Sequence, residues 1–176
     1  MLRHIKNLLL LSALVLTCNI ASAEDLIDLK RTARNPTTPA NTLQQLARHD
    51  NIDVRQNVAR NRRAPAELLH ELAQDPEDKI RITVITNTAT AEKTHLLLAS
   101  DKQQHVRSVL ARYEYCSAAV MDKLADDASV EIRIEVAKNW NTSLATLQKM
   151  TSDSFPEVRH TAAREMTKRK LEAAEQ

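Results

Sequence analysis

The chain has 176 residues, no glycine, one tryptophan, two tyrosines, one phenylalanine and a formal net charge of +2. A β-rich fold needs glycine in turns and aromatic or β-branched residues in strands, and open α/β nucleotide sites need glycine where the backbone approaches phosphate. The composition therefore argues against a β-rich fold and against a phosphate-loop enzyme, and it predicts an all-α protein.

Residues 1–23 are typical of a secretory signal peptide. A basic start precedes an apolar run over residues 8–16, and Ala21-Ser22-Ala23 has the small-x-small pattern of a cleavage site. The apolar run is short for a membrane span. We expect cleavage after Ala23 and an exported, periplasmic mature chain. The alternative is a lipoprotein signal with Cys18 as the lipidated residue, although Thr17 is larger than the residue usual before such a cysteine.

Removal of the signal changes the charge and the cysteine content. The segment contains Arg3 and Lys6 and no acidic residue, so the remaining chain has equal numbers of acidic and basic residues. No global charge then favours nucleic acid or an acidic membrane as a partner. Cys116 alone remains, which excludes an intramolecular disulfide and leaves open an intermolecular one.

From residue 33 onward, a unit recurs every 26 residues. A β-branched residue followed by arginine marks each unit, at Val54-Arg55, Ile80-Arg81, Val106-Arg107, Ile132-Arg133 and Val158-Arg159. A fixed period of this length indicates a repeat protein in which each unit buries its apolar face against its neighbours. Residues 24–176 therefore predict one elongated array. Its units lie near 33–58, 59–84, 85–110, 111–136 and 137–162.

Within a unit, the apolar spacing predicts two short helices. The first begins after a position at which a threonine hydroxyl would cap a backbone N–H, and the proline that follows in the first two units suits the first helical position. The capping positions are Thr38, Ala64, Thr90, Cys116 and Thr142. Leu43 and Leu46, spaced by three, place one face of this helix in the core.

The second helix is expected to be the shorter one. Val54 and Val58 lie one turn apart on its buried face. An asparagine marks its end, because asparagine tolerates the left-handed conformation that closes a helix where glycine is absent. These asparagines are Asn35, Asn61, Asn87 and Asn139.

Both ends of the array are expected to be capping half-repeats. Residues 24–34 resemble one second helix with a degraded period, and residues 163–176 are polar enough to cover the last unit.

The first unit, ARNPTTPANTLQQLARHDNIDVRQNV, resembles the leucine-rich repeat variant family. The resemblance rests on Asn35, Pro36, Thr38-Pro39, Leu43, Leu46-Ala47, Val54-Arg55, Val58 and Ala59-Arg60-Asn61. Later units drift, with Ala91 in place of the proline, His95 in place of the first leucine and Tyr113 in place of the asparagine. The resemblance covers about residues 33–165.

The resemblance implies a right-handed α-solenoid of about five two-helix repeats. In that family, α and 3₁₀ helices alternate, and the shape is related to HEAT-type arrays. Some members carry an N-terminal cysteine cluster that holds an iron–sulfur centre. This chain has no such cluster, so no cofactor and no metal are expected.

Two charged columns follow the period. They are Arg55, Arg81, Arg107, Arg133 and Arg159, and Asp75, Asp101, Asp127 and Asp153. Each aspartate lies in the turn about six residues before an arginine, so the two columns can pair. We favour a structural ladder that sets how the units stack, and the alternative is a basic strip for anions.

A second basic column follows the end of the second helix and should be exposed. It comprises Arg34, Arg60, Arg112, Lys138 and Arg164, with Arg62 and Arg63 beside it. These residues are either cations placed favourably near helix C-termini or a surface for an acidic or anionic partner.

The aromatic residues all lie between Tyr113 and Phe155. Tyr113, Tyr115 and Trp140 fall after the second helix of successive units, so stacking should bring them to one edge. Tyrosine and tryptophan are frequent in binding hot spots. The alternative is local packing, because Tyr113 stands where other units have asparagine.

No residue pattern indicates catalysis. The histidines show no metal-ligand spacing, no nucleophile has a recognisable context, and a small residue at a cap position explains Cys116. The sequence predicts an exported, non-enzymatic scaffold that binds another protein in the bacterial cell envelope. The alternatives are anion or polyanion binding through the basic column and, remotely, a HEAT-like enzyme.

Overall fold

The structure, a computed structural model, describes residues 23–175. The predicted signal peptide, with Cys18, falls almost entirely outside the described residues. Within the described part, all elements are α-helices, so the predicted all-α solenoid is confirmed.

Two kinds of helix alternate along the chain. The first helices of the units are α3 (Ala40–Leu46), α5 (Ala66–Leu72), α7 (Glu92–Leu98), α9 (Ala118–Leu124) and α11 (Leu144–Met150). The second helices are α2 (Ala23–Arg34), α4 (Ile52–Arg60), α6 (Asp78–Ile85), α8 (Gln104–Arg112), α10 (Val130–Lys138) and α12 (Pro156–Ala174). No 3₁₀ helix occurs between residues 23 and 175, so both helices of a unit are α-helices.

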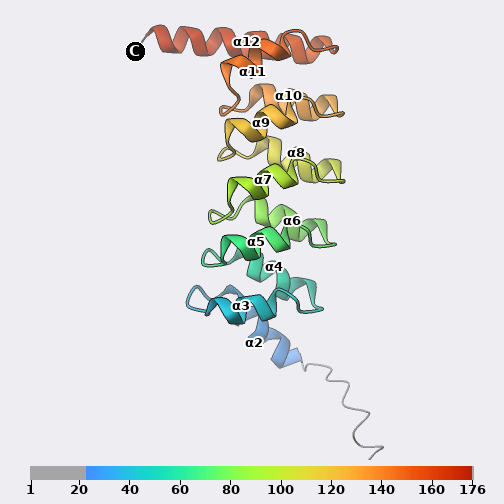
Figure 1. Ribbon diagram of the computed structural model, residues 1–176, viewed down its shortest axis with the longest axis vertical. Helices are drawn as coiled ribbons and strands as arrows, with labels where there is room; N and C mark the ends of the chain where they lie inside the picture. Colours follow the sequence, from blue (N-terminus) through green and yellow to red (C-terminus); the bar gives the residue numbers. More distant parts are fainter. Residues whose placement is uncertain (1–22, 176) are drawn as a thin grey trace, which may run out of the picture.

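The helices stack in two layers, and each second helix packs against the second helices of the units before and after it (Figure 1). The core lies between the layers. In the first unit, it comprises Ala33, Leu43, Leu46, Val54 and Val58, and equivalent residues are buried in the later units. The apolar spacing thus places each helix with one face on its neighbours, which is why an isolated unit has no complete core.

The two helices of a unit differ in length from the prediction. The first helix has seven residues in every unit, whereas α4, α6, α8 and α10 have eight or nine. The prediction that the second helix is the shorter one was therefore wrong. The first helix starts late, because the backbone stays extended up to Pro39, and it ends again at Leu46.

The threonine before the first helix is not its cap. The N-caps lie one residue later, at Pro39, Pro65, Ala91, Ser117 and Ser143. Thr38 Oγ1 instead donates to the Thr32 carbonyl at 2.6 Å, which adds a second hydrogen bond to a carbonyl in the last turn of α2. The same bond joins Thr90 to Val84, Cys116 to Leu110 and Thr142 to Val136.

The asparagines do not close the second helices in a left-handed conformation. Asn61 has φ −70° and ψ 117°, and Asn139 has φ −67° and ψ 129°, both extended. No described residue has a positive φ. The side chain of asparagine, rather than its backbone, therefore explains why it recurs.

The predicted C-terminal cap, residues 163–176, continues the second helix of the last unit. The helix α12 runs unbroken through residue 163 and lies across the end of the array, where it projects beyond the stack (Figure 1). Its continuity has a local reason, because Glu165 occupies the position at which the earlier units have an asparagine.

The connecting loops form two opposite edges of the array (Figure 1). We name the edge with loops 35–39, 61–65, 87–91, 113–117 and 139–143 the asparagine edge. We name the edge with loops 47–51, 73–77, 99–103, 125–129 and 151–155 the arginine edge.

Candidate functional site

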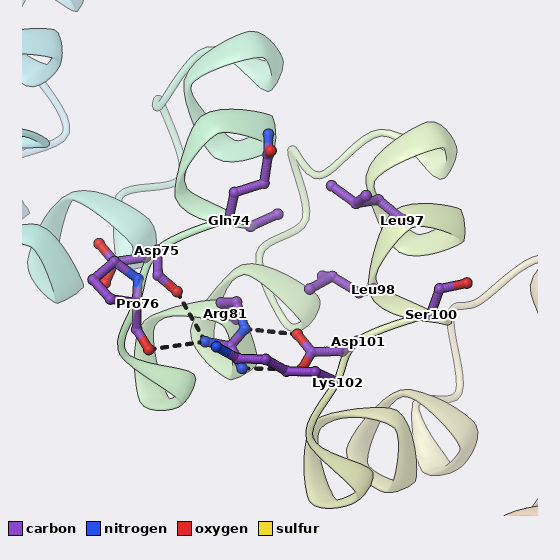
Figure 2. A pocket seen from close by; sticks show the side chains of 10 residues that line it. Gln74, Asp75, Pro76, Arg81, Leu97, Leu98, Ser100, Asp101 and Lys102 are labelled. Carbon is purple, nitrogen blue, oxygen red and sulfur yellow. Dashed lines mark hydrogen bonds and ion pairs between the residues drawn. The ribbon is translucent and has the colours of Figure 1, made fainter. Parts of the chain in front are cut away.

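The arginine edge carries a ladder of bidentate ion pairs. Arg81 Nε and Nη2 donate to the two carboxylate oxygens of Asp101 at 2.6 and 2.9 Å (Figure 2). The same geometry joins Arg55 to Asp75, Arg107 to Asp127 and Arg133 to Asp153. Each arginine thus pairs with the aspartate 20 residues later, in the next unit.

The remaining donors and acceptors of each rung are also used. Arg81 Nη1 donates to the carbonyls of Asp75 and Pro76, and Asp101 Oδ1 accepts the backbone N–H of Gln103. The arginine therefore reaches the aspartate six residues before it through the backbone, while its carboxylate partner lies in the following unit. Each guanidinium ties together two successive turns.

Burial and pairing shift the titration of the ladder. The hydrogen bond to Asp101 raises the pKa of Arg81, and the hydrogen bond from Arg133 lowers the pKa of Asp153. In the Arg81–Asp101 pair, each side chain is only 5% exposed. A paired, enclosed arginine has little charge to offer an external anion, so this geometry supports a structural role for the ladder.

The ladder has different ends. At the first turn, His49 occupies the aspartate position, and its Nδ1 accepts the Asn51 N–H at 3.0 Å. At the last turn, Arg159 donates to the carbonyls of Asp153 and Ser154 but has no carboxylate partner among the described residues.

The asparagine edge carries a second ladder, which the sequence analysis missed. Asn87 Nδ2 donates to the carbonyls of Ala59 and Asn61 in the preceding unit, at 2.7 and 3.0 Å. Its Oδ1 accepts the N–H of Ala89. The same three bonds recur at Asn61 and at Asn139. The exact period of these asparagines was the available signal, although by itself it favours an explanation from backbone conformation.

This second ladder is interrupted once and then capped. At the interruption, Tyr113 replaces the asparagine, and His95 Nε2 lies 3.0 Å from the Ile85 carbonyl, 28 residues before Tyr113. That is the carbonyl that an asparagine at 113 would bind. At the end of the array, Arg169 donates to the carbonyl of Asn139 at 2.7 Å and also to that of Thr142.

A small pocket lies at the interruption. Its lining residues are Asn87, Thr88, Thr90, His95, Tyr113 and Tyr115, and its volume is about 240 Å³. The His95 and Tyr113 rings meet edge to face with centroids 5.7 Å apart, and the Tyr113 and Tyr115 rings are 5.6 Å apart. Burial lowers the pKa of His95 and raises the pKa of Tyr113, so both rings are neutral at pH 7.

Of the predicted aromatic cluster, the structure brings two members together. Tyr113 and Tyr115 are in contact, whereas the Trp140 ring lies under the Arg169 guanidinium at 5.7 Å. Tyr115 and Trp140 are 80% and 71% exposed. A hydrogen bond from Asn141 to the Glu114 carbonyl joins their two loops.

The predicted basic column is exposed throughout. Lys138 pairs with Glu135 and Arg164 with Glu165, at 3.3 and 3.2 Å. Arg34, Arg60, Arg62, Arg63 and Arg112 make no ion pair with any described residue. Near Arg34, a groove of about 600 Å³ is lined by Lys30, Arg31, Arg34, Asn35, Pro36 and Asn57.

The described residues contain neither a metal-binding cluster nor an ionised cysteine. No cluster of three histidine, cysteine or acidic side chains there is arranged to hold a metal ion. Cys116 is buried, and burial raises its pKa to about 12, so it is a thiol at neutral pH.

None of the helices between residues 23 and 175 combines the length and apolar character needed to cross a membrane.

The stacked two-helix units and their two ladders define a helical repeat protein of the solenoid class. Residues 28–84 match the Leucine Rich Repeat Variant domain family. The fold is similar to a solved structure described as a leucine-rich repeat variant with a novel repetitive protein structural motif, at 22% identity and a TM-score of 0.62. The family match thus covers residues 28–84, in line with the sequence resemblance, and the structural likeness shows that the same fold extends along the array.

The match to that solved structure covers 83% of this chain and 57% of the other, so this chain spans little more than half of its length. A crystal structure of an engineered protein from the Northeast Structural Genomics Consortium is 16% identical, with a TM-score of 0.43 over 88% of this chain and 92% of that one. No curated protein matches the chain.

Proposed function

We propose that this protein is an exported, non-enzymatic scaffold that binds another protein through its asparagine edge. The observation that carries the proposal is the exposure of Tyr115 and Trp140 in successive loops of that edge. Large aromatic side chains bury much area at little entropic cost when a partner covers them.

The loops that carry these rings are held in place before any partner binds. Asn139 ties its own loop to the preceding one through the carbonyls of Ala111 and Tyr113, and Arg169 holds the same loop from α12. Preorganised loops lose less conformational entropy on association, which favours a binding role.

A double variant tests this function. After affinity capture from the envelope fraction has identified a partner, Tyr115→Ala with Trp140→Ala should weaken binding by about 2–4 kcal/mol. Binding is measured by isothermal titration calorimetry, with Phe155→Ala as the control because Phe155 is an exposed aromatic residue on the arginine edge. Unchanged affinity of a folded double variant would overturn the proposal.

Export rests on the N-terminal sequence and has its own test. Mass spectrometry of the protein purified from the periplasm should find a mature chain that begins at Glu24. A chain that begins at a lipidated Cys18 would support the lipoprotein alternative, and an unprocessed cytoplasmic chain would contradict export.

Anion binding is the second candidate, favoured by the unpaired arginines of the first two units. Arg34 lines the groove of about 600 Å³, and Arg60, Arg62 and Arg63 are exposed without an ion pair among the described residues. Binding to a polyanion should weaken steeply as salt rises and should be lost in Arg62→Glu with Arg63→Glu. Affinity for the partner that is insensitive to salt would favour the aromatic surface instead.

A further inference from the structure

The interruption of the asparagine ladder consists of two substitutions that complement each other. Tyr113 removes the amide that would bind the Ile85 carbonyl, and His95 supplies a replacement donor from the position where the first and second units have a leucine. Because the bond partner is a carbonyl, His95 carries its proton on Nε2, and Nδ1 is left as an acceptor. The Ile85 carbonyl therefore keeps a side-chain donor here although the usual asparagine is absent.

The two substitutions, His95 and Tyr113, change which side chains line the asparagine edge at this position. The pocket of about 240 Å³ has the buried side chains of Asn87 and His95, and the exposed side chains of Thr88 and Tyr115. Sites for drug-sized ligands occupy roughly 300–1,000 Å³. The volume at the interruption is thus suited to one side chain rather than to a metabolite or cofactor.

The chemistry of the lining restricts the occupant. The lining contains no aspartate, glutamate, lysine or arginine, and burial lowers the pKa of His95, so nothing in the lining neutralises a buried phosphate, carboxylate or ammonium group. Two tyrosine rings already pack edge to face, an arrangement that a third ring can extend. Hydroxyl groups of threonine and tyrosine offer hydrogen bonds to a polar atom on that ring.

We propose that this pocket, between loops 87–91 and 113–117, receives an uncharged aromatic side chain of the protein partner. The inference rests on the proposed scaffold function and adds the chemistry of the residue that the partner inserts. Tyr115 then forms one wall of the pocket, and Trp140 in the next loop extends the contact surface beyond it.

The pocket is tested with small probes on the full chain by ¹H–¹⁵N NMR. N-acetyl-phenylalaninamide and N-acetyl-tyrosinamide should shift the amide signals of Thr88, Tyr113 and Tyr115 saturably, with a Kd on the order of 1 mM for so small a ligand. N-acetyl-lysinamide and N-acetyl-glutamate should produce no saturable shift there. Equal shifts by the charged probes, or none by the aromatic ones, would overturn the proposal.

Two variants test whether the probes bind in this pocket. His95→Leu with Tyr113→Asn restores the residues found in the second unit and should weaken probe binding at least tenfold while the chain stays folded. Thr88→Arg places a long side chain at the pocket mouth from an exposed position and should have the same effect without disturbing the ladder. Phe155→Ala is the matched control and should bind the probes like the wild type. Probe binding that survives both pocket variants contradicts the assignment.

The same variants separate this inference from the scaffold function. If Trp140→Ala weakens partner binding while Thr88→Arg does not, the scaffold function stands and the pocket proposal fails. If the aromatic double variant keeps full affinity for the partner, both proposals fail, because Tyr115 belongs to the scaffold surface and to the wall of the pocket.

Discussion

Both edges of this array join successive units through side-chain hydrogen bonds, but they use different side chains to do so. On the arginine edge, four consecutive charged pairs run from Arg55 to Asp153 without interruption. On the asparagine edge, neutral amides bind carbonyls of the preceding unit instead, and Tyr113 interrupts them. The exposed Tyr115 lies in the interrupted loop, and the exposed Trp140 lies in the next one. The comparison teaches that strict periodicity marks the residues that hold the units together. The position where the period fails is the better candidate for function.

Loss of a guanidinium should be the most damaging change. Arg81→Ala leaves Asp101 as an enclosed carboxylate without its partner, so we expect a loss of about 3 kcal/mol in the free energy of unfolding. Urea denaturation followed by circular dichroism measures it. Arg112→Ala, in the exposed column, is the control and should change stability by less than about 0.5 kcal/mol. Equal effects of the two variants would refute the structural role of the ladder.

Loss of an amide on the opposite edge should cost somewhat less. Asn87→Ala removes the side-chain donor from the carbonyls of Ala59 and Asn61, of which the second keeps the Ala64 N–H, and this should lower the free energy of unfolding by about 2 kcal/mol. Asn35→Ala is the matched control, because Asn35 is exposed and its side chain bonds only within its own loop, to Thr37. A ladder that contributes nothing would show the same melting curve for both variants.

A double-mutant cycle tests whether His95 and Tyr113 are energetically coupled. His95→Leu alone removes the donor to the Ile85 carbonyl and should destabilise by about 1–2 kcal/mol. Adding Tyr113→Asn restores an amide donor to that carbonyl, so the double variant should recover most of the loss. The coupling energy, from urea melts of all four proteins, should be about 1–2 kcal/mol. Strictly additive effects would show that the two residues are not energetically coupled.

The smallest expected effect is a difference in pH dependence between the two edges. Burial lowers the pKa of His95 from 6.5, so the unfolded chain takes up this proton first, and stability falls as the pH drops through that value. Asp153 has a pKa lowered from 3.8 by Arg133, so its contribution is complete above about pH 4 and is lost below it. Stability should decline in two stages as the solution is acidified.

The variants assign the two stages. The first decline should be reduced in the double variant His95→Leu with Tyr113→Asn, whereas the acid decline below about pH 4 should persist in it. Melting temperatures measured between pH 8 and pH 3 make the comparison. An unchanged first decline in the double variant would show that His95 is not its source.

The sequence by itself determined the architecture of this protein. An all-α solenoid could be predicted from the period of 26 residues and from the apolar spacing of Leu43 and Leu46, and of Val54 and Val58. This is because every unit of a stacked array has the same local structure and the same packing on its neighbours. It also paired the arginine and aspartate columns, although it did not place each carboxylate in the following unit. That assignment depends on how far one unit rotates and shifts on the next, which no local pattern contains.

Only the tertiary structure decided what the loop residues do. The sequence predicts Asn87 as a helix terminator, whereas its amide donates to two carbonyls of the preceding unit. The sequence predicts Thr38 as a helix cap, whereas its hydroxyl donates to a carbonyl of α2. The link between His95 and Tyr113 could not be predicted either, because it too depends on contacts between units. Both substitutions are visible in the chain, but the carbonyl of Ile85 that makes them one event becomes their common partner only when the units are stacked.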